Sequence, residues 1–286
     1  MKIQQKTRVR PWFGRRIIPV ICLAALVSTN PVAAFANGFL LAPTRLIFEG
    51  PGRSQELTIM NQSDKPQTYR LRVEDRRLKE DGQYDLITDN ADPTVASPML
   101  RLSVRQISIP PRSSSTVRVL LRKPIGQAAG EVRSHLVVTE LPVVNVAVPA
   151  SEQNSEITVS ITTIFGISIP VLVRTGETSA RIATVTKTRV VRPDNPQLES
   201  VVVRAEATGT RSMFLDVRLV STRNRRATPI AQARSFALYA PLGPRILTLS
   251  LDAEQTAKLR AGNVVLQYQE VNRDGAPIGA VTEIAF

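Results

Sequence analysis

The feature that most constrains the fold of this chain is a regular alternation of short apolar runs with turn-forming residues. From Phe39 onward, runs rich in Val, Ile, Leu and Thr alternate with clusters of Gly, Pro, Asn, Asp and Ser. Their spacing of roughly 8–12 residues is typical of β-sandwiches. The pattern restarts after Thr175, and long helical patterns are scarce. The sequence therefore predicts an all-β chain with two sandwiches.

The strands that we expect can be bounded from these runs. The first sandwich would use Leu40–Phe48, Gln55–Asn61, Gln67–Glu74, Tyr84–Thr88, Leu100–Ile109, Ser115–Arg122, Val132–Leu141 and Ile157–Arg174. The second would use Ala180–Val191, Ser200–Ala207, Phe214–Ser221, Ile230–Tyr239, Arg245–Leu251, Asn263–Glu270 and Ala280–Phe286. One short helix is expected where Asp252 can cap the segment from Ala253 to Leu259, with Gly262 at its end.

The first 36 residues have the features of a secretory signal peptide. They contain six basic and no acidic side chains, continue with the apolar run Ile17–Val27, and end in Ala34-Phe35-Ala36. That ending is an A-x-A cleavage site. The apolar run is shorter than the about 20 residues of a membrane span, and Pro19 interrupts it. We therefore expect cleavage after Ala36, export to the periplasm and no stable membrane insertion.

Cleavage would change the composition of the chain. It would remove the only cysteine, Cys22, so packing without disulfides must stabilise the mature protein. It would also lower the formal net charge from +13 to +7, because six of the 37 Lys and Arg residues lie in the signal peptide. The remaining arginines are scattered among the expected strands and lack an aromatic stacking platform. A nucleic-acid partner is therefore not expected.

The mature sequence lacks the residue groups that common catalytic sites need. Its only histidine is His135, and one histidine without cysteines or clustered carboxylates does not make a typical zinc site. The acidic stretch 89–92 lacks the ligand and glycine spacing of a calcium loop. Asp81-Gly82 and Asp274-Gly275 are hairpin signals. We therefore expect no enzymatic activity, no metal site and no cofactor.

Residues 157–174 carry an alternating apolar pattern that is unusually long. The odd positions from Ile157 to Val173 are apolar except for Thr163, and alternate side chains share one face of a strand. A 17-residue strand would span about 55 Å, more than one sandwich covers. An overhanging apolar edge strand is suited to pairing with another chain. A long strand that covers only its own core is the alternative that the periodicity leaves open.

Several motifs resemble, in their order, the periplasmic chaperones that assemble pili and fimbriae in the chaperone–usher pathway. The motifs are residues 42–48 (APTRLIF), 57–61 (LTIMN), 96–103 (ASPMLRLS) and 140–142 (ELP). The resemblance covers essentially the whole mature chain and implies two immunoglobulin-like β-sandwich domains at an angle, in a boomerang arrangement. It implies an N-terminal pilin-binding domain at 37–175 and a C-terminal domain at 176–286. The pattern of Gly166–Val171 is similar to a divergent, alternative or archaic branch of the family.

The resemblance also implies a function and a site. Such a chaperone stabilises pilin subunits by donor-strand complementation and delivers them to an outer-membrane usher. Arg45 would hold the terminal carboxylate of the subunit. Many members have a lysine that shares this task, but Pro170 stands in its place here, so Arg118 or Arg133 is expected to contribute. The donor residues that would fill the groove of an incomplete pilin are Ile157, Val159, Ile161, Thr163 and Phe165.

We expect a structural role for two charged residues, Glu131 and Arg174. Glu131 and Arg174 lie at the ends of neighbouring expected strands, where an interdomain ion pair is favoured over a ligand contact.

The main rival function is that of a structural or adhesive β-sandwich subunit of the cell surface. Such a subunit would carry a ligand face with clustered aromatic residues, whereas the only tryptophan of this chain, Trp12, lies in the signal peptide. A hydrolase on a sandwich scaffold lacks its catalytic residues. The sequence leaves open whether the free chaperone self-associates to cover its edge strand.

Overall fold

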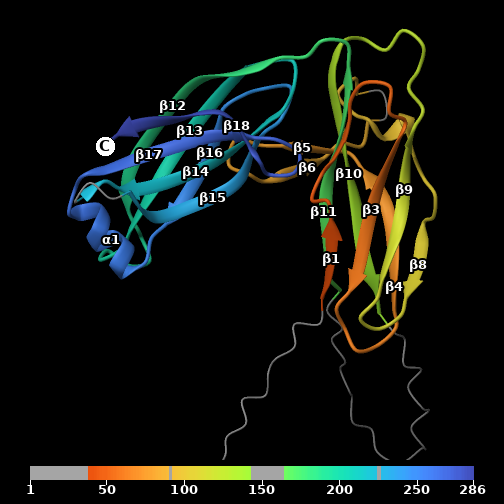
Figure 1. The fold of residues 1–286 in the computed structure, drawn as a ribbon, viewed down its shortest axis with the longest axis horizontal. Helices are drawn as coiled ribbons and strands as arrows, with labels where there is room; N and C mark the ends of the chain where they lie inside the picture. Colours follow the sequence, from red (N-terminus) through yellow and green to blue (C-terminus); the bar gives the residue numbers. More distant parts are fainter. Residues whose placement is uncertain (1–37, 90–91, 143–163, 224–226) are drawn as a thin grey trace, which may run out of the picture. The chain divides into compact units, whose positions relative to one another are not determined.

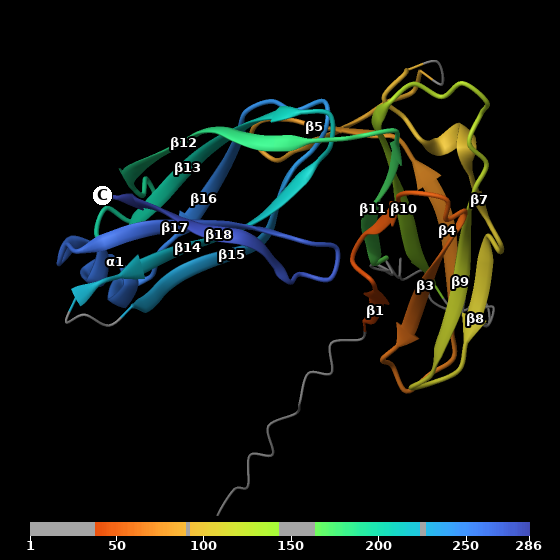
Figure 2. The ribbon, with the colours of Figure 1, turned by 45° about the horizontal axis from the view of Figure 1, so that its top comes forward.

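Strands dominate the computed structural model, which describes residues 38–89, 92–142, 164–223 and 227–286. Residues Asn37–Phe286 form one compact unit. In the described ranges the strands make four larger sheets and one two-stranded hairpin, and the two large apolar cores are built from different strands. Figure 1 and Figure 2 show the two groups of strands. The prediction of an all-β chain with two sandwiches is confirmed.

The first sandwich packs a four-stranded sheet against a five-stranded sheet. Their strand orders are β1-β3-β9-β7 and β2-β11-β10-β4-β8. The strands are β1 (Phe39–Ala42), β2 (Leu46–Phe48), β3 (Ser54–Asn61), β4 (Gln67–Glu74), β7 (Leu100–Leu102), β8 (Gln106–Ile109), β9 (Ser114–Leu121), β10 (Gly130–Leu141) and β11 (Gly166–Thr175). A 3-10 turn, η1 (Ser97–Met99), precedes β7. Apolar side chains such as Leu57, Tyr69, Val117 and Leu136 fill the space between the sheets.

The second sandwich packs a three-stranded sheet against a four-stranded sheet. Their orders are β12-β13-β16 and β15-β14-β17-β18. The strands are β12 (Ala180–Val191), β13 (Glu199–Gly209), β14 (Met213–Ser221), β15 (Thr228–Leu238), β16 (Arg245–Ser250), β17 (Val264–Val271) and β18 (Pro277–Ala285). The core includes Val203, Leu215, Leu219 and Leu266. Alternate residues of β13 are buried, as expected of a strand with one face on a core.

The local turn and cap predictions are confirmed. Gly82 lies at φ +96° in the turn between β5 (Arg76–Leu78) and β6 (Tyr84–Leu86), and Gly275 lies at φ +84° between β17 and β18. The helix α1 (Ala253–Arg260) begins after Asp252, whose side chain accepts a hydrogen bond from the backbone N–H of Gln255. The Gln255 side chain accepts from the backbone N–H of Asp252 in return, which completes a capping box.

Two expected strands are divided between the sheets of the first sandwich. The run Leu40–Phe48 becomes β1, which pairs with β3, and β2, which pairs in parallel with β11. The run Leu100–Ile109 likewise becomes β7, which pairs with β9, and β8, which pairs with β4. The predictions of single strands are therefore wrong. In the first case Pro43 follows β1, where its missing N–H cannot continue a ladder.

The long strand expected at 157–174 is described only in part. Within the described residues the strand is β11, from Gly166 to Thr175. Its partner β10 pairs with it from Gly130 opposite Thr175 to Thr139 opposite Gly166. The donor positions Ile157, Val159, Ile161 and Thr163 lie outside the described residues. No helix in the described ranges is both long and apolar enough to cross a membrane.

Candidate functional site

Arg45 is a buried cation of the first sandwich. It immediately precedes β2 and is only 3% exposed. Its guanidinium carbon lies 3.9 Å from the centroid of the Phe214 ring, in β14 of the second sandwich. Arginine stacks favourably on aromatic faces because the ring presents negative charge to the cation. The side chain therefore connects the two sandwiches.

Two backbone carbonyls and one hydroxyl accept the hydrogen bonds of Arg45. Its Nε donates to the carbonyl of Arg273 at 3.1 Å, and its Nη2 donates to the carbonyl of Asn272 at 2.9 Å. Nη2 also lies 3.4 Å from the Ser235 hydroxyl. Burial lowers the pKa of Arg45, whereas the charges of Tyr239, Asp216 and Asp274 act in the opposite direction. The carbonyls of Asn272 and Arg273, in the turn between β17 and β18, thus bind the Arg45 cation. We call these two groups the carbonyl cradle of Arg45.

A small apolar cluster lies beside this cradle. Ile47 and Leu172 from the first sandwich pack with Phe214 and Val271 from the second, and Ala237 and Tyr239 are packed against them. These contacts exclude water from one side of the Arg45 guanidinium, so its polar partners matter more than they would at an exposed position.

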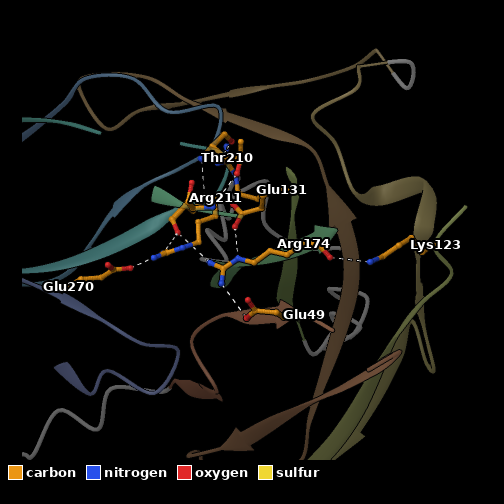
Figure 3. Close-up of polar contacts among 11 residues, drawn as sticks. Glu49, Lys123, Glu131, Arg174, Thr210, Arg211 and Glu270 are labelled. Atoms are coloured by element: carbon orange, nitrogen blue, oxygen red, sulfur yellow. Dashed lines mark hydrogen bonds and ion pairs between the residues drawn. The ribbon is translucent and has the colours of Figure 1, made fainter. Parts of the chain in front are cut away.

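Glu131 and Arg174 form an ion pair between neighbouring strands (Figure 3). They are directly opposite each other in the β10–β11 ladder, and Arg174 Nε lies 2.9 Å from Glu131 Oε2. The side chains are 0% and 10% exposed respectively. Arg174 also donates to the backbone carbonyl of Ser212, whose hydroxyl donates to Glu131. The pair is thus bound to the second sandwich through Ser212.

A cavity of about 510 Å³ adjoins both Arg174 and the carbonyl cradle of Arg45. Arg211 and Glu270 form an ion pair at 2.7 Å on its wall (Figure 3). Asn272 and Arg273, which hold Arg45, also line it. Its wall carries both acidic and basic side chains, together with Ile47, Phe214 and Ile278. Such a cleft can accept a polar chain end beside an apolar segment.

The two arginines expected to assist Arg45 differ in their positions. Arg118 lies in β9 on the face turned away from the core, where it pairs with Glu56 of β3 at 3.1 Å. Its side chain is 66% exposed. Arg133 is buried, stacks on Tyr239 at 4.0 Å, and donates to the carbonyls of Ala240 and Arg76. The structure thus brings Arg133, and not Arg118, to the contacts between the sandwiches.

Pro170 stands opposite His135 in the β10–β11 ladder. His135 is also buried, between Tyr84 at 5.1 Å and Tyr239 at 6.3 Å between ring centroids. Many members of the pilus-assembly chaperone family that the sequence resembles have a lysine at the position of Pro170. In this chain that position is therefore next to an aromatic cluster.

Among the described residues, no group of three or more His, Cys, Asp and Glu is placed to hold a metal ion.

Phe165 is the one expected donor residue in the described part of the chain. Phe165 is 54% exposed, and the neighbouring Ile164 is 56% exposed. The carbonyl of Phe165 accepts a hydrogen bond from the backbone N–H of Glu140 at 2.9 Å. Backbone pairing with β10 therefore continues to Phe165, while its side chain stays outside the core.

Sequence reasoning did not find the partners of Arg45 in the second sandwich. The Asp274-Gly275 signal locates the turn between β17 and β18, but the groups that hold Arg45 are the backbone carbonyls of Asn272 and Arg273. Every residue has a carbonyl, so no residue type marks these two. The aromatic partner Phe214 had a signal only as an apolar residue of an expected strand.

Comparison with known proteins finds one matching family model and several similar solved structures. The family model described as pili and flagellar-assembly chaperone, PapD N-terminal domain, matches residues 38–176. Similar solved structures include the CupB2 chaperone of Pseudomonas aeruginosa, with 12% identity, a TM-score of 0.45, and coverage of 86% of this chain and 99% of that one. The E. coli chaperone DraB has 13% identity, a TM-score of 0.44, and coverage of 87% and 98%.

A third similar structure is a complex. It contains the chaperone CsuC and the tip-adhesion subunit CsuE of the archaic chaperone–usher Csu pili of Acinetobacter baumannii. The match has 10% identity and a TM-score of 0.44, and it covers 86% of this chain and 98% of that one. No curated protein sequence matches this chain significantly.

Proposed function

This chain belongs, through the domain at residues 38–176, to the family of pili and flagellar-assembly chaperones, and on this premise we propose that it is a periplasmic chaperone of pilin subunits. The family match is the observation that carries the proposal. In this proposal the signal peptide is cleaved after Ala36, the domain at 37–175 binds the pilin, and the domain at 176–286 completes the cleft. The protein acts by binding, without an enzymatic step or a cofactor.

The donor strand is the first part of the proposed mechanism. A pilin that lacks its last strand exposes an apolar groove, and a strand from the chaperone covers it through backbone pairing and alternate side chains. Ile157, Val159, Ile161 and Phe165 would enter the groove, with Thr163 between them. Each fully buried large side chain contributes about 1.5–3 kcal/mol before the cost of ordering the strand. The exposed side chain of Phe165 beside a backbone already paired to β10 supports this use.

The second part is recognition of the pilin's terminal carboxylate by Arg45. The carbonyls of Asn272 and Arg273 now accept its hydrogen bonds. A carboxylate is a stronger acceptor for a guanidinium than a carbonyl is, because it carries a full negative charge and can accept two parallel N–H bonds. In the proposal the carboxylate enters the adjoining cleft and replaces carbonyl contacts of Arg45. This fixes the register of the donor strand, after which an outer-membrane usher receives the subunit.

The donor strand can be tested with two substitutions on opposite faces of one segment. Ile161→Asp places a charge in the proposed pilin groove, whereas Thr162→Asp places the same charge on the other face. Mature protein with a C-terminal affinity tag is isolated from periplasm that contains the cognate pilin, and mass spectrometry identifies what is recovered with it. Ile161→Asp is expected to lose the pilin and Thr162→Asp to retain it. Equal recovery with both variants would rule out the donor-strand assignment.

The carboxylate anchor is tested in the same isolation. Arg45→Ala is expected to reduce pilin recovery strongly, while Arg118→Ala, at an exposed arginine, should leave it unchanged. Circular dichroism of each purified variant checks that it is folded. A folded Arg45→Ala protein that recovers the pilin normally would remove Arg45 from the mechanism. Wild-type protein recovered alone, although candidate pilins are expressed, would favour a structural or adhesive sandwich subunit.

A further inference from the structure

A second pocket, with a volume of about 150 Å³, is lined by β5 of the β5–β6 hairpin and by residues 239–245 of the second sandwich. The hairpin lies beside β16 of the second sandwich (Figure 2), where the backbone N–H of Ile246 donates to the carbonyl of Glu80 at 2.9 Å. The pocket is separate from the 510 Å³ cleft, because the described residues lining the two cavities do not overlap. It is far larger than the roughly 10–15 Å³ that one water needs, so a small polyatomic ligand fits its size.

Arginines dominate the charge of this pocket. Arg76, Arg77, Arg133 and Arg245 all line it, and no acidic side chain does so among the described residues. Arg76 pairs with Glu74, with Nε 2.9 Å from Oε2, and Arg77 pairs with Asp92 at 2.6 Å. These two cations are thus partly neutralised from outside the pocket wall.

The other two cations have carbonyl acceptors. Arg245 donates to the carbonyls of Lys79, Glu80 and Ala237. Arg133 donates to the carbonyls of Ala240 at 3.4 Å and Arg76 at 3.2 Å. Carbonyl oxygens satisfy N–H groups but bring no full negative charge. The pocket wall therefore retains excess positive charge.

Arg133 is a buried cation with an unsatisfied hydrogen-bond donor. It is 8% exposed, stacks on the Tyr239 ring at 4.0 Å, and its buried Nε has no hydrogen-bond partner. Burial lowers its pKa, because desolvation disfavours the charged form. A buried guanidinium is stable when an anion compensates it. Its environment thus favours a negatively charged ligand nearby.

We propose that this pocket is a binding site for a small oxyanion. Guanidinium groups bind planar carboxylates and tetrahedral phosphate or sulfate through paired N–H donors, a geometry that a lysine cannot reproduce. The anion adds charge-assisted hydrogen bonds to Arg133, Arg245 and Arg77 and connects the hairpin to residues 239–245. The site differs from the Arg45 cradle in position and in residues, and it functions in the free protein.

Calorimetric titration of the mature chain, residues 37–286, with sodium phosphate tests the proposal. Sodium chloride at equal ionic strength is the reference, because it matches the screening of surface charge. Wild type is expected to bind phosphate saturably with one site. Arg133→Lys keeps the positive charge but loses the paired N–H donors of the guanidinium. It should weaken phosphate binding at least about tenfold. Arg77→Gln, at the exposed rim, should weaken it about two- to fivefold.

Arg118→Gln is the matched control, because this exposed arginine pairs with Glu56 in the sheet that contains β3 and β9 and does not line the pocket. It should bind phosphate as wild type does. Denaturant unfolding of each variant shows that it is folded. Absence of saturable binding to wild type, or equal affinity of folded Arg133→Lys, Arg77→Gln and wild type, would overturn the proposal.

Acetate in place of phosphate distinguishes two sources of the ligand. Tighter binding of acetate indicates a protein carboxylate, and tighter binding of phosphate indicates a free inorganic oxyanion. Both outcomes support the oxyanion site. No pilin is present in this experiment, so its failure is distinguishable from a failure of pilin capture.

Discussion

His135 lies in the middle of β10 and is 2% exposed, although it is a polar side chain. Neither ring nitrogen has a hydrogen-bond partner, and its ring meets Tyr84 and Tyr239 edge-on. Burial, followed by the charges of Arg133 and Arg76, lowers its pKa to about 3. The histidine is therefore neutral in the folded protein over most of the pH range, which is consistent with a structural role.

This shift predicts a dependence of stability on pH. Between about pH 6.5 and pH 3 the unfolded chain binds a proton at His135 and the folded chain does not, so the free energy of unfolding falls as pH falls. The full contribution is present above about pH 6.5. At pH 4.5 the loss is on the order of 3 kcal/mol, from about 1.4 kcal/mol per pH unit. His135→Phe, which keeps an apolar ring in the cluster, should remove this loss.

Urea unfolding from pH 7 to pH 4.5 measures the effect. Carboxylates whose pKa is lowered in the fold, such as Glu74 and Glu199, also reduce stability in acid. Their effect is common to both proteins, so the difference between wild type and His135→Phe isolates the histidine. Parallel curves for the two proteins would contradict the assignment.

At the scale of elements, the short helix α1 is held by its first turn. Asp252 caps it, and Gln255 both completes the capping box and donates through Nε2 to the carbonyl of Ile230 in β15 at 2.7 Å. Thr256 and Leu259 are buried. Isolated helices of this length are unstable in water, so the cap and these contacts with the sandwich maintain it.

Asp252→Ala is expected to lower the free energy of unfolding by about 1 kcal/mol, because it leaves a backbone N–H of the first turn without its acceptor. Asp252→Asn is the matched control, since asparagine is an equally good N-cap. Chemical denaturation of the three proteins provides the measurement. A loss of the same size in Asp252→Asn would show that charge, and not the capping bond, is responsible.

The strand exchanges of the first sandwich also belong to this scale. Within each run, β1 and β2, like β7 and β8, pair with different sheets. Between the two strands of each run the chain crosses from one sheet to the other. One short run therefore contributes a strand to each sheet of the sandwich. The change near Arg45 brings β2 beside β11 and places Arg45 next to the second sandwich.

At the scale of the whole molecule, buried polar groups couple the two sandwiches. An exposed ion pair contributes up to about 1 kcal/mol, but the side chains of Glu131 and Arg174 are 0% and 10% exposed. Ser212 of the second sandwich contacts both. Removing Glu131 leaves the buried Arg174 with the largely exposed Glu49, 3.3 Å away, as its remaining acidic partner among the described residues, which is far more costly than losing an exposed pair.

Glu131→Gln is therefore expected to lower the free energy of unfolding by about 3 kcal/mol. Glu56→Gln breaks the exposed pair with Arg118 and should change it by less than about 1 kcal/mol. Calorimetry measures both the stability and the cooperativity of the two sandwiches, and loss of coupling would separate their transitions. Equal, small effects of the two substitutions would contradict a structural role of the buried pair.

The sequence alone determined the features that depend on local chemistry. The period-two apolar pattern predicted most strands because one face of each strand must be buried. The Asx-Gly signals located two hairpin turns, since glycine accommodates a positive φ, and Asp252 predicted the helix start because its carboxylate can accept a backbone N–H. The family resemblance rested on motifs whose order is preserved along the chain, and it was confirmed by the match to residues 38–176.

The tertiary structure alone decided what depends on contacts between distant residues. Arg45 is separated by 227 and 228 positions from the carbonyls that hold it, and a carbonyl has no identity in the sequence. The fold buried the Glu131–Arg174 pair against Ser212 of the second sandwich, and it placed four arginines around one pocket. Solvent exposure and through-space distance set the energies of charged groups, and both are properties of the assembled fold.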